Sequence, residues 1–179
     1  MAIDPSQLEL AIYPAPILKG RAETVKNIDD DVRAVSKRMI EMLYEHNGVG
    51  LAAPQIGLPW RLFVTRANPG SESQEVDSGR VFINPELTTD PVEIQEMEEG
   101  CLSIPDVHIS LKRPSHAVIR AFDENGNAFE EHDTGYAARV WQHEFDHLNG
   151  VLIIDKMTPM DRLVTRKTLK ALRDSYKGT

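Results

Sequence analysis

The chain has 179 residues, of which 41% are hydrophobic, and both values suit one globular domain with a substantial core. Asp and Glu outnumber Lys and Arg by 28 to 20, and the resulting charge of −8 argues against general attraction to nucleic-acid phosphates. The single cysteine excludes an internal disulfide, and neither a secretory signal pattern nor a long apolar run is present. We therefore expect a soluble, cytoplasmic protein without a membrane segment.

The first half of the chain begins irregularly and then predicts a helix. Residues 11–28 cannot begin as a helix, because Pro14 and Pro16 block it. Residues 29–46 form the first predicted helix, with acidic residues at its start and Asn47-Gly48 at its end. Its apolar positions, at helical spacing, are Val32, Val35, Met39, Met42 and Leu43.

The middle of the chain predicts short strands separated by turns. Residues 48–59 are rich in Gly and Pro and predict a loop or bent strand, and the polar stretch 67–79 predicts a mobile surface loop. Pro85 is expected to end one of the strands. The predicted strands are 61–66, 80–84, 92–97, 116–123 and 128–132, the last two joined by a hairpin turn at Asn125-Gly126.

The last part predicts a second helix at 134–148, ended by Asn149-Gly150, a short apolar strand at 151–154 and a third helix at 159–176. The fold class that follows is α+β, with mostly antiparallel strands around a central helix. We expect one catalytic domain over residues 1–179, with a core of about 10–160 and a C-terminal helix of about 159–176.

The segment 143–147 (HEFDH) of the second predicted helix carries the strongest chemical signal. Residues four apart share one helix face, so His143 and His147 can bind one metal ion while Glu144 reaches a metal-bound water. The alternative is an ordinary helix with two histidines. Burying these polar side chains without a partner would be costly, and a metal ion would be such a partner.

A catalytic metal site usually needs a third protein ligand. The common peptidase patterns place it downstream, but no Glu follows Glu144 and no His follows His147. Upstream, Cys101 is the leading candidate, because a thiolate is a strong ligand for zinc or ferrous iron. A free cysteine is more often a small buried apolar residue, and aspartates stay open as alternatives. These are Asp155, Asp161 and Asp174.

A third feature is the glycine-rich segment 48–57, which lacks the spacing and the lysine of a phosphate-binding loop. It could be a simple turn. Gln55 is nevertheless a polar residue among apolar neighbours, and its amide could donate a hydrogen bond to a carbonyl oxygen at a hydrolytic centre.

Three segments together resemble the signature motifs of the peptide deformylase family. They are Gly48–Gly57 (GVGLAAPQIG), Glu99–Pro105 (EGCLSIP) and Gln142–Gly150 (QHEFDHLNG). Ala11–Leu18 (AIYPAPIL) is similar to the family's start, and Val151–Met157 (VLIIDKM) to its usual continuation. The resemblance covers about residues 10–160, and three motifs in order are far more specific than the His-Glu-His pattern alone.

The resemblance implies an enzyme that hydrolyses the formyl group from the N-terminal formylmethionine of new polypeptides and releases formate. It implies one divalent metal ion, usually ferrous iron, with zinc, nickel or cobalt as replacements. The implied metal ligands are Cys101, His143 and His147. Glu144 becomes the general acid/base, and Gln55 and the backbone N–H of Leu102 become oxyanion donors. Gly50 would approach the substrate backbone. The methionine pocket would be lined by Val49, Leu102 and Val140.

Other functions and details stay open at this level. Another metal-dependent amidohydrolase or peptidase could use the same site, and a non-catalytic metal-binding or ribosome-associated protein is a different class. The basic tail 162–177 would suit a transient ribosome contact, although charged helix faces are usually just solvated. Asp106, where many relatives have Gly, and His108 leave the fine specificity open. A bacterial protein and a mature organellar one are not distinguished.

Overall fold

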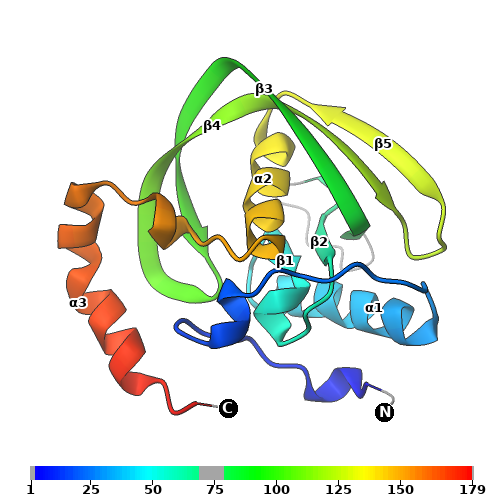
Figure 1. Cartoon of the computed structure of the whole chain (residues 1–179), viewed down its shortest axis with the longest axis horizontal. Helices are drawn as coiled ribbons and strands as arrows, with labels where there is room; N and C mark the ends of the chain where they lie inside the picture. Colours follow the sequence, from blue (N-terminus) through cyan, green and yellow to red (C-terminus); the bar gives the residue numbers. More distant parts are fainter. Residues whose placement is uncertain (1–2, 69–78, 179) are drawn as a thin grey trace.

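The computed structural model describes residues 3–68 and 79–178. Its strands form one antiparallel sheet in the order β1-β2-β3-β4-β5. Figure 1 shows the long strands β3 and β4 arching over the central helix α2, while α3 stands at one side. The expected α+β domain, with antiparallel strands around a central helix and a C-terminal helix, is confirmed. The strands are β1 (Gly50–Ala52), β2 (Leu62–Arg66), β3 (Gly79–Cys101), β4 (Ile104–Phe122) and β5 (Ala128–Asp133), and the helices are α1 (Asp30–Glu45), α2 (Tyr136–Leu148) and α3 (Pro159–Ser175).

Strand β3 is one long strand, and the prediction of two short strands at 80–84 and 92–97, with an end at Pro85, was wrong. The pairing of β3 with β4 shifts register between Ile83 and Glu86 and again between Asp90 and Ile94. Pro85 and Pro91 fall inside these irregularities, so their missing N–H groups remove no regular ladder bond. The predicted start of the next strand at 116 was also too late: β4 begins at residue 104, because its first half pairs with the second half of β3.

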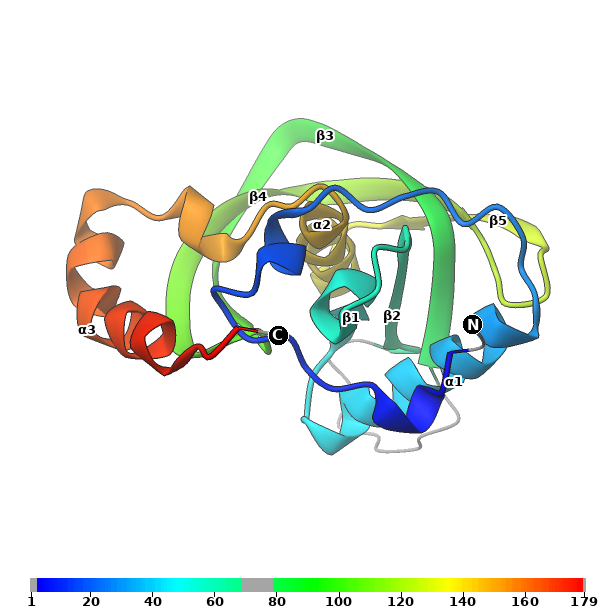
Figure 2. The same cartoon turned by 60° about the horizontal axis from the view of Figure 1, so that its bottom comes forward.

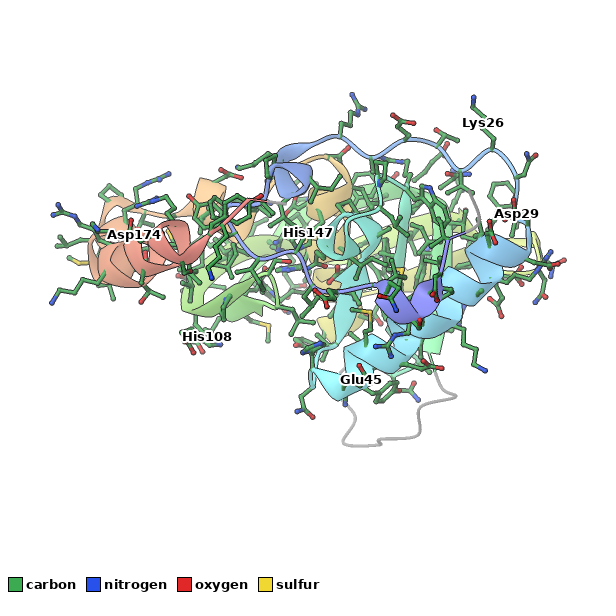
Figure 3. All side chains as sticks on the ribbon, turned by 90° about the horizontal axis from the view of Figure 1, so that it is seen from below. Lys26, Asp29, Glu45, His108, His147 and Asp174 are labelled. Carbon is green, nitrogen blue, oxygen red and sulfur yellow. The ribbon has the colours of Figure 1, made fainter. Side chains whose placement is uncertain are left out.

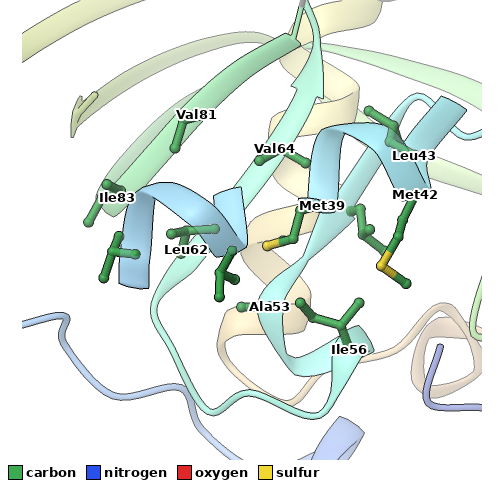
Figure 4. Close-up of a cluster of buried hydrophobic side chains, with 12 residues drawn as sticks. Met39, Met42, Leu43, Ala53, Ile56, Leu62, Val64, Val81 and Ile83 are labelled. Carbon is green, nitrogen blue, oxygen red and sulfur yellow. The ribbon is translucent and has the colours of Figure 1, made fainter. Parts of the chain in front are cut away.

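Helix α1 begins after Asp29, whose side chain accepts a hydrogen bond from the Val32 N–H at 3.1 Å. All five of its predicted apolar positions are buried. They pack against β1, β2 and β3 in one core cluster, and Figure 4 shows Met39, Met42 and Leu43 of the helix beside Leu62, Val64 and Val81 of the strands. Because this face is fixed, the turn after α1 holds residues 48–50 in one place against β2.

Helix α2 is buried on most of its surface, with Ala138, Trp141 and Leu148 packed against Phe63 and Phe82 of the sheet. It ends at Asn149, followed by Gly150 at a φ of +71°, as predicted. The hairpin turn is also confirmed, since Gly126 joins β4 to β5 at a φ of +82°. A buried helix inside an arch of strands gives polar side chains on α2 an enclosed environment.

The predicted strand at 151–154 is wrong. These residues lead into a short 3-10 helix, η4 (Ile153–Lys156), and the N–H of Leu152 donates to the Asp155 carboxylate at 2.7 Å. The apolar run is buried against β4 and α3 in a second core cluster, which explains why it read as a strand. The predicted loop at 67–79 lies almost wholly outside the described residues.

The N-terminal segment crosses the molecule as an irregular strap (Figure 2) with two 3-10 turns, η1 (Pro5–Gln7) and η2 (Pro16–Lys19). The Ala11 N–H donates to the Gln55 carbonyl at 2.7 Å, and the Tyr13 N–H donates to the Ser103 carbonyl at 2.9 Å. The strap thereby ties two loops together, one after β1 and one after β3. Among the described helices, none combines the length and apolar character needed to cross a membrane.

Candidate active site

The three motif segments meet at one cavity of about 510 Å³, which opens to the surface. Its walls come from the turn and strand at 46–50, the end of β3, the start of β4 and one face of α2. The cavity exists because the β3–β4 arch brings residue 101 next to a helix that lies about 40 positions later in the sequence.

Cys101, His143 and His147 converge at the inner end of this cavity, and their ligand atoms all lie within 4.8 Å of one another. The Cys101 Sγ lies 3.3 Å from the His147 Nε2, which in turn lies 3.3 Å from the His143 Nε2. Metal bonds of about 2.0–2.3 Å at tetrahedral angles separate ligand atoms by about 3.3–3.6 Å. The spacing of the three side chains therefore fits one metal ion. His147, labelled in Figure 3, is 2% exposed.

The alternative aspartate ligands do not join this cluster. Asp155 binds Lys19 and the N–H of Leu152, and Asp161 accepts hydrogen bonds from Thr158 at the start of α3. Within residues 3–68 and 79–178, the cysteine and the two histidines are the one group of three metal-binding side chains whose ligand atoms converge.

Glu99 is the buried anion behind the cluster. It accepts hydrogen bonds from Arg113 at 2.6 Å, from Arg139 at 2.5 Å and from the His143 Nδ1 at 3.1 Å. Burial by itself would raise the pKa of Glu99, but the hydrogen bonds from Arg113 and His143 outweigh it and hold the pKa far below its ordinary value. Because Nδ1 donates to Glu99, a neutral His143 has its Nε2 lone pair toward the cluster, as a metal ligand requires.

The surroundings of Cys101, His143 and His147 stabilise one additional positive charge on this cluster. Burial alone would lower the pKa of His143, but hydrogen bonds to Cys101 and Glu99 and the charge of Glu144 raise it to about 10. Burial and the charge of His143 keep the pKa of His147 well below its ordinary value, so one imidazole takes a proton and its neighbour does not. A divalent cation bound by a thiolate and two neutral imidazoles would supply the same charge, so the donor set also fits chemically.

Glu144 directly follows His143 in the sequence and is 3% exposed. Its Oε2 is a buried atom without a hydrogen-bond partner among the described residues. Burial raises the pKa of Glu144 to about 7, which makes the carboxyl able to accept or release a proton near neutral pH. A Cβ on Gly50 would lie 2.3 Å from the Glu144 Oε1, so the glycine is what allows β1 to approach this carboxyl.

Gln55 is 1% exposed and has a fixed orientation. Its Oε1 accepts the Ala52 N–H at 2.8 Å, and its Nε2 consequently points to the Ser103 Oγ at 3.2 Å and the Cys101 Sγ at 3.6 Å. The donor end of the amide therefore faces the cluster, as an oxyanion donor would.

The structure brings every predicted site residue to this one cavity except His147, which lies just behind its wall and contacts Cys101 and His143. Val140 is buried, while Val49 and Leu102 are half-buried on the facing walls. Sequence reasoning missed the buried network around Glu99, although that residue opens the EGCLSIP segment. Nothing local marked Arg113 and Arg139, because their burial depends on strand pairing and helix packing far along the chain.

Comparison with known proteins agrees with this geometry. Residues 7–163 match the family model described as polypeptide deformylase. A peptide deformylase of Thermodesulfovibrio yellowstonii is 44% identical over 91% of this chain and 96% of its own length. One of Thermotoga maritima is 41% identical over 94% and 98%. The solved structure of a Plasmodium falciparum peptide deformylase superposes with a TM-score of 0.86 and 39% identity, covering 94% of this chain and 97% of that one. The chain belongs to the peptide deformylase family, metal-dependent hydrolases that remove the N-formyl group from nascent polypeptides.

Proposed function

We propose that formylmethionine at the start of a new polypeptide is deformylated in this cavity, with formate and a free N-terminus as products. The observation that carries the assignment of roles is the unpartnered, buried carboxyl of Glu144 beside three convergent metal-binding side chains. A general acid/base next to a metal site is what hydrolysis of an unactivated formamide requires.

Cys101, His143 and His147 would hold one divalent ion, with ferrous iron as the native metal and zinc, nickel or cobalt as substitutes. The mixed thiolate and imidazole set suits these ions better than magnesium or calcium. When bound, the ion supplies a Lewis acid for the formyl carbonyl and acidifies a water. Glu99 keeps His143 in the tautomer that leaves Nε2 free for this task.

Glu144 takes the proton of the attacking water at its carboxylate and later delivers it to the leaving amine nitrogen. A pKa of about 7, raised by burial, serves both directions of transfer near neutral pH. Gly50 leaves room for this carboxyl and lets the substrate backbone run close to β1.

Two donors stabilise the oxygen that becomes negative in the tetrahedral intermediate: the Gln55 side-chain amide and the backbone N–H of Leu102. The Ala52 N–H holds the Gln55 amide with its donor end toward the reacting group. One such donor typically contributes about 3 kcal/mol of transition-state stabilisation. The methionine side chain would lie between Val49, Leu102 and Val140.

The decisive experiment replaces Glu144 by Gln and measures formate release from formyl-methionyl peptides together with bound metal. We expect metal content to be kept while turnover falls by at least about a thousandfold, because the proton acceptor is lost. Near-normal turnover would refute the mechanism. Cys101→Ser is the companion variant, and unchanged metal affinity there would remove Cys101 as a ligand.

We further propose that the catalytic unit comprises residues 1–179 with its core at about 10–160. It would act in the bacterial cytoplasm, where formylated chains are made. A mature organellar form is the alternative, since a tomato relative named as chloroplastic is 38% identical over 94% of this chain.

A transient contact with the ribosome through α3 is a separate proposal. The first half of the helix exposes Met160, Leu163 and Val164, and cationic residues follow along it. Cosedimentation with ribosomes should weaken between about 50 and 300 mM salt if cations contact RNA phosphates, and should be lost on deletion of residues 159–179. Binding that survives the deletion would exclude α3 as the docking element.

A further inference from the structure

The mouth of the cavity is acidic. Its lining residues include Glu98 and Asp106, both of which are exposed. Arg139 is the one lysine or arginine in the described lining, and it is buried and paired with Glu99. A ligand that leaves the cavity therefore passes two exposed acidic residues, and the described lining itself offers no exposed lysine or arginine.

Strand pairing explains why Glu98 is exposed at the edge of the cavity. Side chains alternate along β3, so the buried Glu99 faces α2 while Glu98 and Gly100 face outward. Gly100 pairs with His108 of β4, and a Cβ on Gly100 would lie 2.9 Å from that imidazole ring. His108 thus covers the glycine and lines the cavity together with it, and Figure 3 shows His108 at the surface of the molecule.

Asp106 occupies a backbone position that favours glycine. Its φ is +62°, in the left-handed region, which Asp tolerates better than most residues. The chain keeps the local conformation and adds a carboxylate at the opening, next to Pro105 and Val107 of the cavity wall.

We propose that Glu98 and Asp106 make this enzyme select formylated chains with Lys or Arg within the first few residues after formylmethionine, and disfavour acidic ones. The inference rests on the proposed function, which puts the formyl group at the metal cluster. An extended chain advances about 3.4 Å per residue, so the residues that follow formylmethionine would lead from the cluster toward the opening.

The expected preference for basic over acidic peptides is modest, because solvent screens the charges at the mouth of the cavity. A unit charge about 7 Å from an exposed carboxylate changes affinity by about two- to threefold at low ionic strength. Two carboxylates acting on a Lys-to-Glu change predict a ratio of kcat/KM of about tenfold or more at 20 mM salt. Screening should reduce the ratio to about threefold at 300 mM.

The test uses C-terminally amidated formyl-Met-Ala-Lys, formyl-Met-Ala-Gln and formyl-Met-Ala-Glu with the metal-loaded full chain. Asp106→Asn and Glu98→Gln remove charge at nearly constant shape, and Asn accepts a positive φ as readily as Asp. The double variant should bring the Lys-to-Glu ratio close to one. Asp31→Asn is the matched control. It removes an exposed charge fifteen residues, or about 22 Å, from the cavity end of α1 and should leave the ratio unchanged.

A wild-type ratio below twofold at 20 mM salt, or a ratio that survives in the double variant, would overturn the proposal. The neutral peptide separates this failure from failure of the proposed function, because it should be hydrolysed in either case. Calorimetric binding of the Lys and Glu peptides to Glu144→Gln gives a second readout that does not need turnover. Equal dissociation constants there would also count against the carboxylates.

Discussion

Gly50 shows how one missing side chain sets the geometry of the Glu144 carboxyl, the proposed general acid/base. We expect Gly50→Ala to lower kcat/KM by at least about a hundredfold, because the new Cβ would lie 2.3 Å from the Glu144 Oε1 and displace it. Steady-state assays with formyl-Met-Ala-Gln check this. Gly20→Ala, at a φ of −76° with its nearest contact at 3.3 Å, is the control and should keep full activity. Equal activity of both variants would mean that the Glu144 carboxyl is not held by β1.

Glu99 shows the opposite case, a buried charge with several partners. Glu99→Gln should cost about 3–5 kcal/mol of unfolding free energy, because Arg113 and Arg139 would be left without their anion, and should weaken metal affinity by about 10–100-fold. Urea denaturation and competition with a metal indicator measure the two effects. Glu98→Gln, the exposed neighbour, should change stability by less than about 0.5 kcal/mol. A stability loss of similar size in both variants would show that the buried network contributes little.

At the scale of elements, α2 and α3 differ in how they are held. Helix α2 is enclosed by the sheet and carries the site, whereas α3 buries only Thr165 and Leu169 among its described residues. None of the described cavity-lining residues comes from α3. The helix therefore contributes packing to the second core cluster and no wall to the site.

This difference predicts a loss of stability without a loss of activity. Leu169→Ala should lower the unfolding free energy by about 2 kcal/mol, while kcat/KM on short peptides stays within about twofold. Val164→Ala on the same helix, where the side chain is 73% exposed, should be nearly neutral in both measurements. A large fall in kcat/KM for Leu169→Ala would reveal coupling between α3 and the cavity.

At the scale of the whole molecule, the metal site joins segments that are distant in sequence. Cys101 ends β3, while His143 and His147 lie on α2, so a bound ion would cross-link the sheet to the central helix. The strap at residues 11–13 adds two backbone hydrogen bonds to the loops beside it. Stability and metal binding should therefore be linked.

Removing the metal tests this linkage. An ion present at about 1,000 times its dissociation constant stabilises the fold by about 4 kcal/mol, so anaerobic chelation should lower the Tm by about 10 °C and abolish turnover. Scanning calorimetry before and after chelation, and again after ferrous iron is restored, checks the prediction. Cys101→Ser should show a smaller drop, because fewer ligands bind the ion. A Tm that stays constant when the metal is stripped would show that the ion does not cross-link the fold.

The amino-acid sequence by itself determined the three helices and the chemistry of the site. The Asp29 cap, the apolar spacing of α1 and the Asn149-Gly150 end of α2 act within a few residues, because helical hydrogen bonds are local. The spacing of His143, Glu144 and His147 follows from the same local geometry. The motif around Cys101 was recognisable in sequence, but its distance from α2 was not.

Only the tertiary structure decided how distant segments pair. Strand hydrogen bonds join residues far apart in the chain, so the register shifts that absorb Pro85 and Pro91 left no local signal, and the apolar run at 151–154 read as a strand. The Glu99 network and the acidic mouth at Glu98 and Asp106 arise the same way. The candidate metal ligands could be named from the sequence, because their residue types suit a metal ion and the motifs resemble those of a known family. The distances that bring Cys101 to α2 could not, because they depend on the long-range pairing of β3 with β4 around α2.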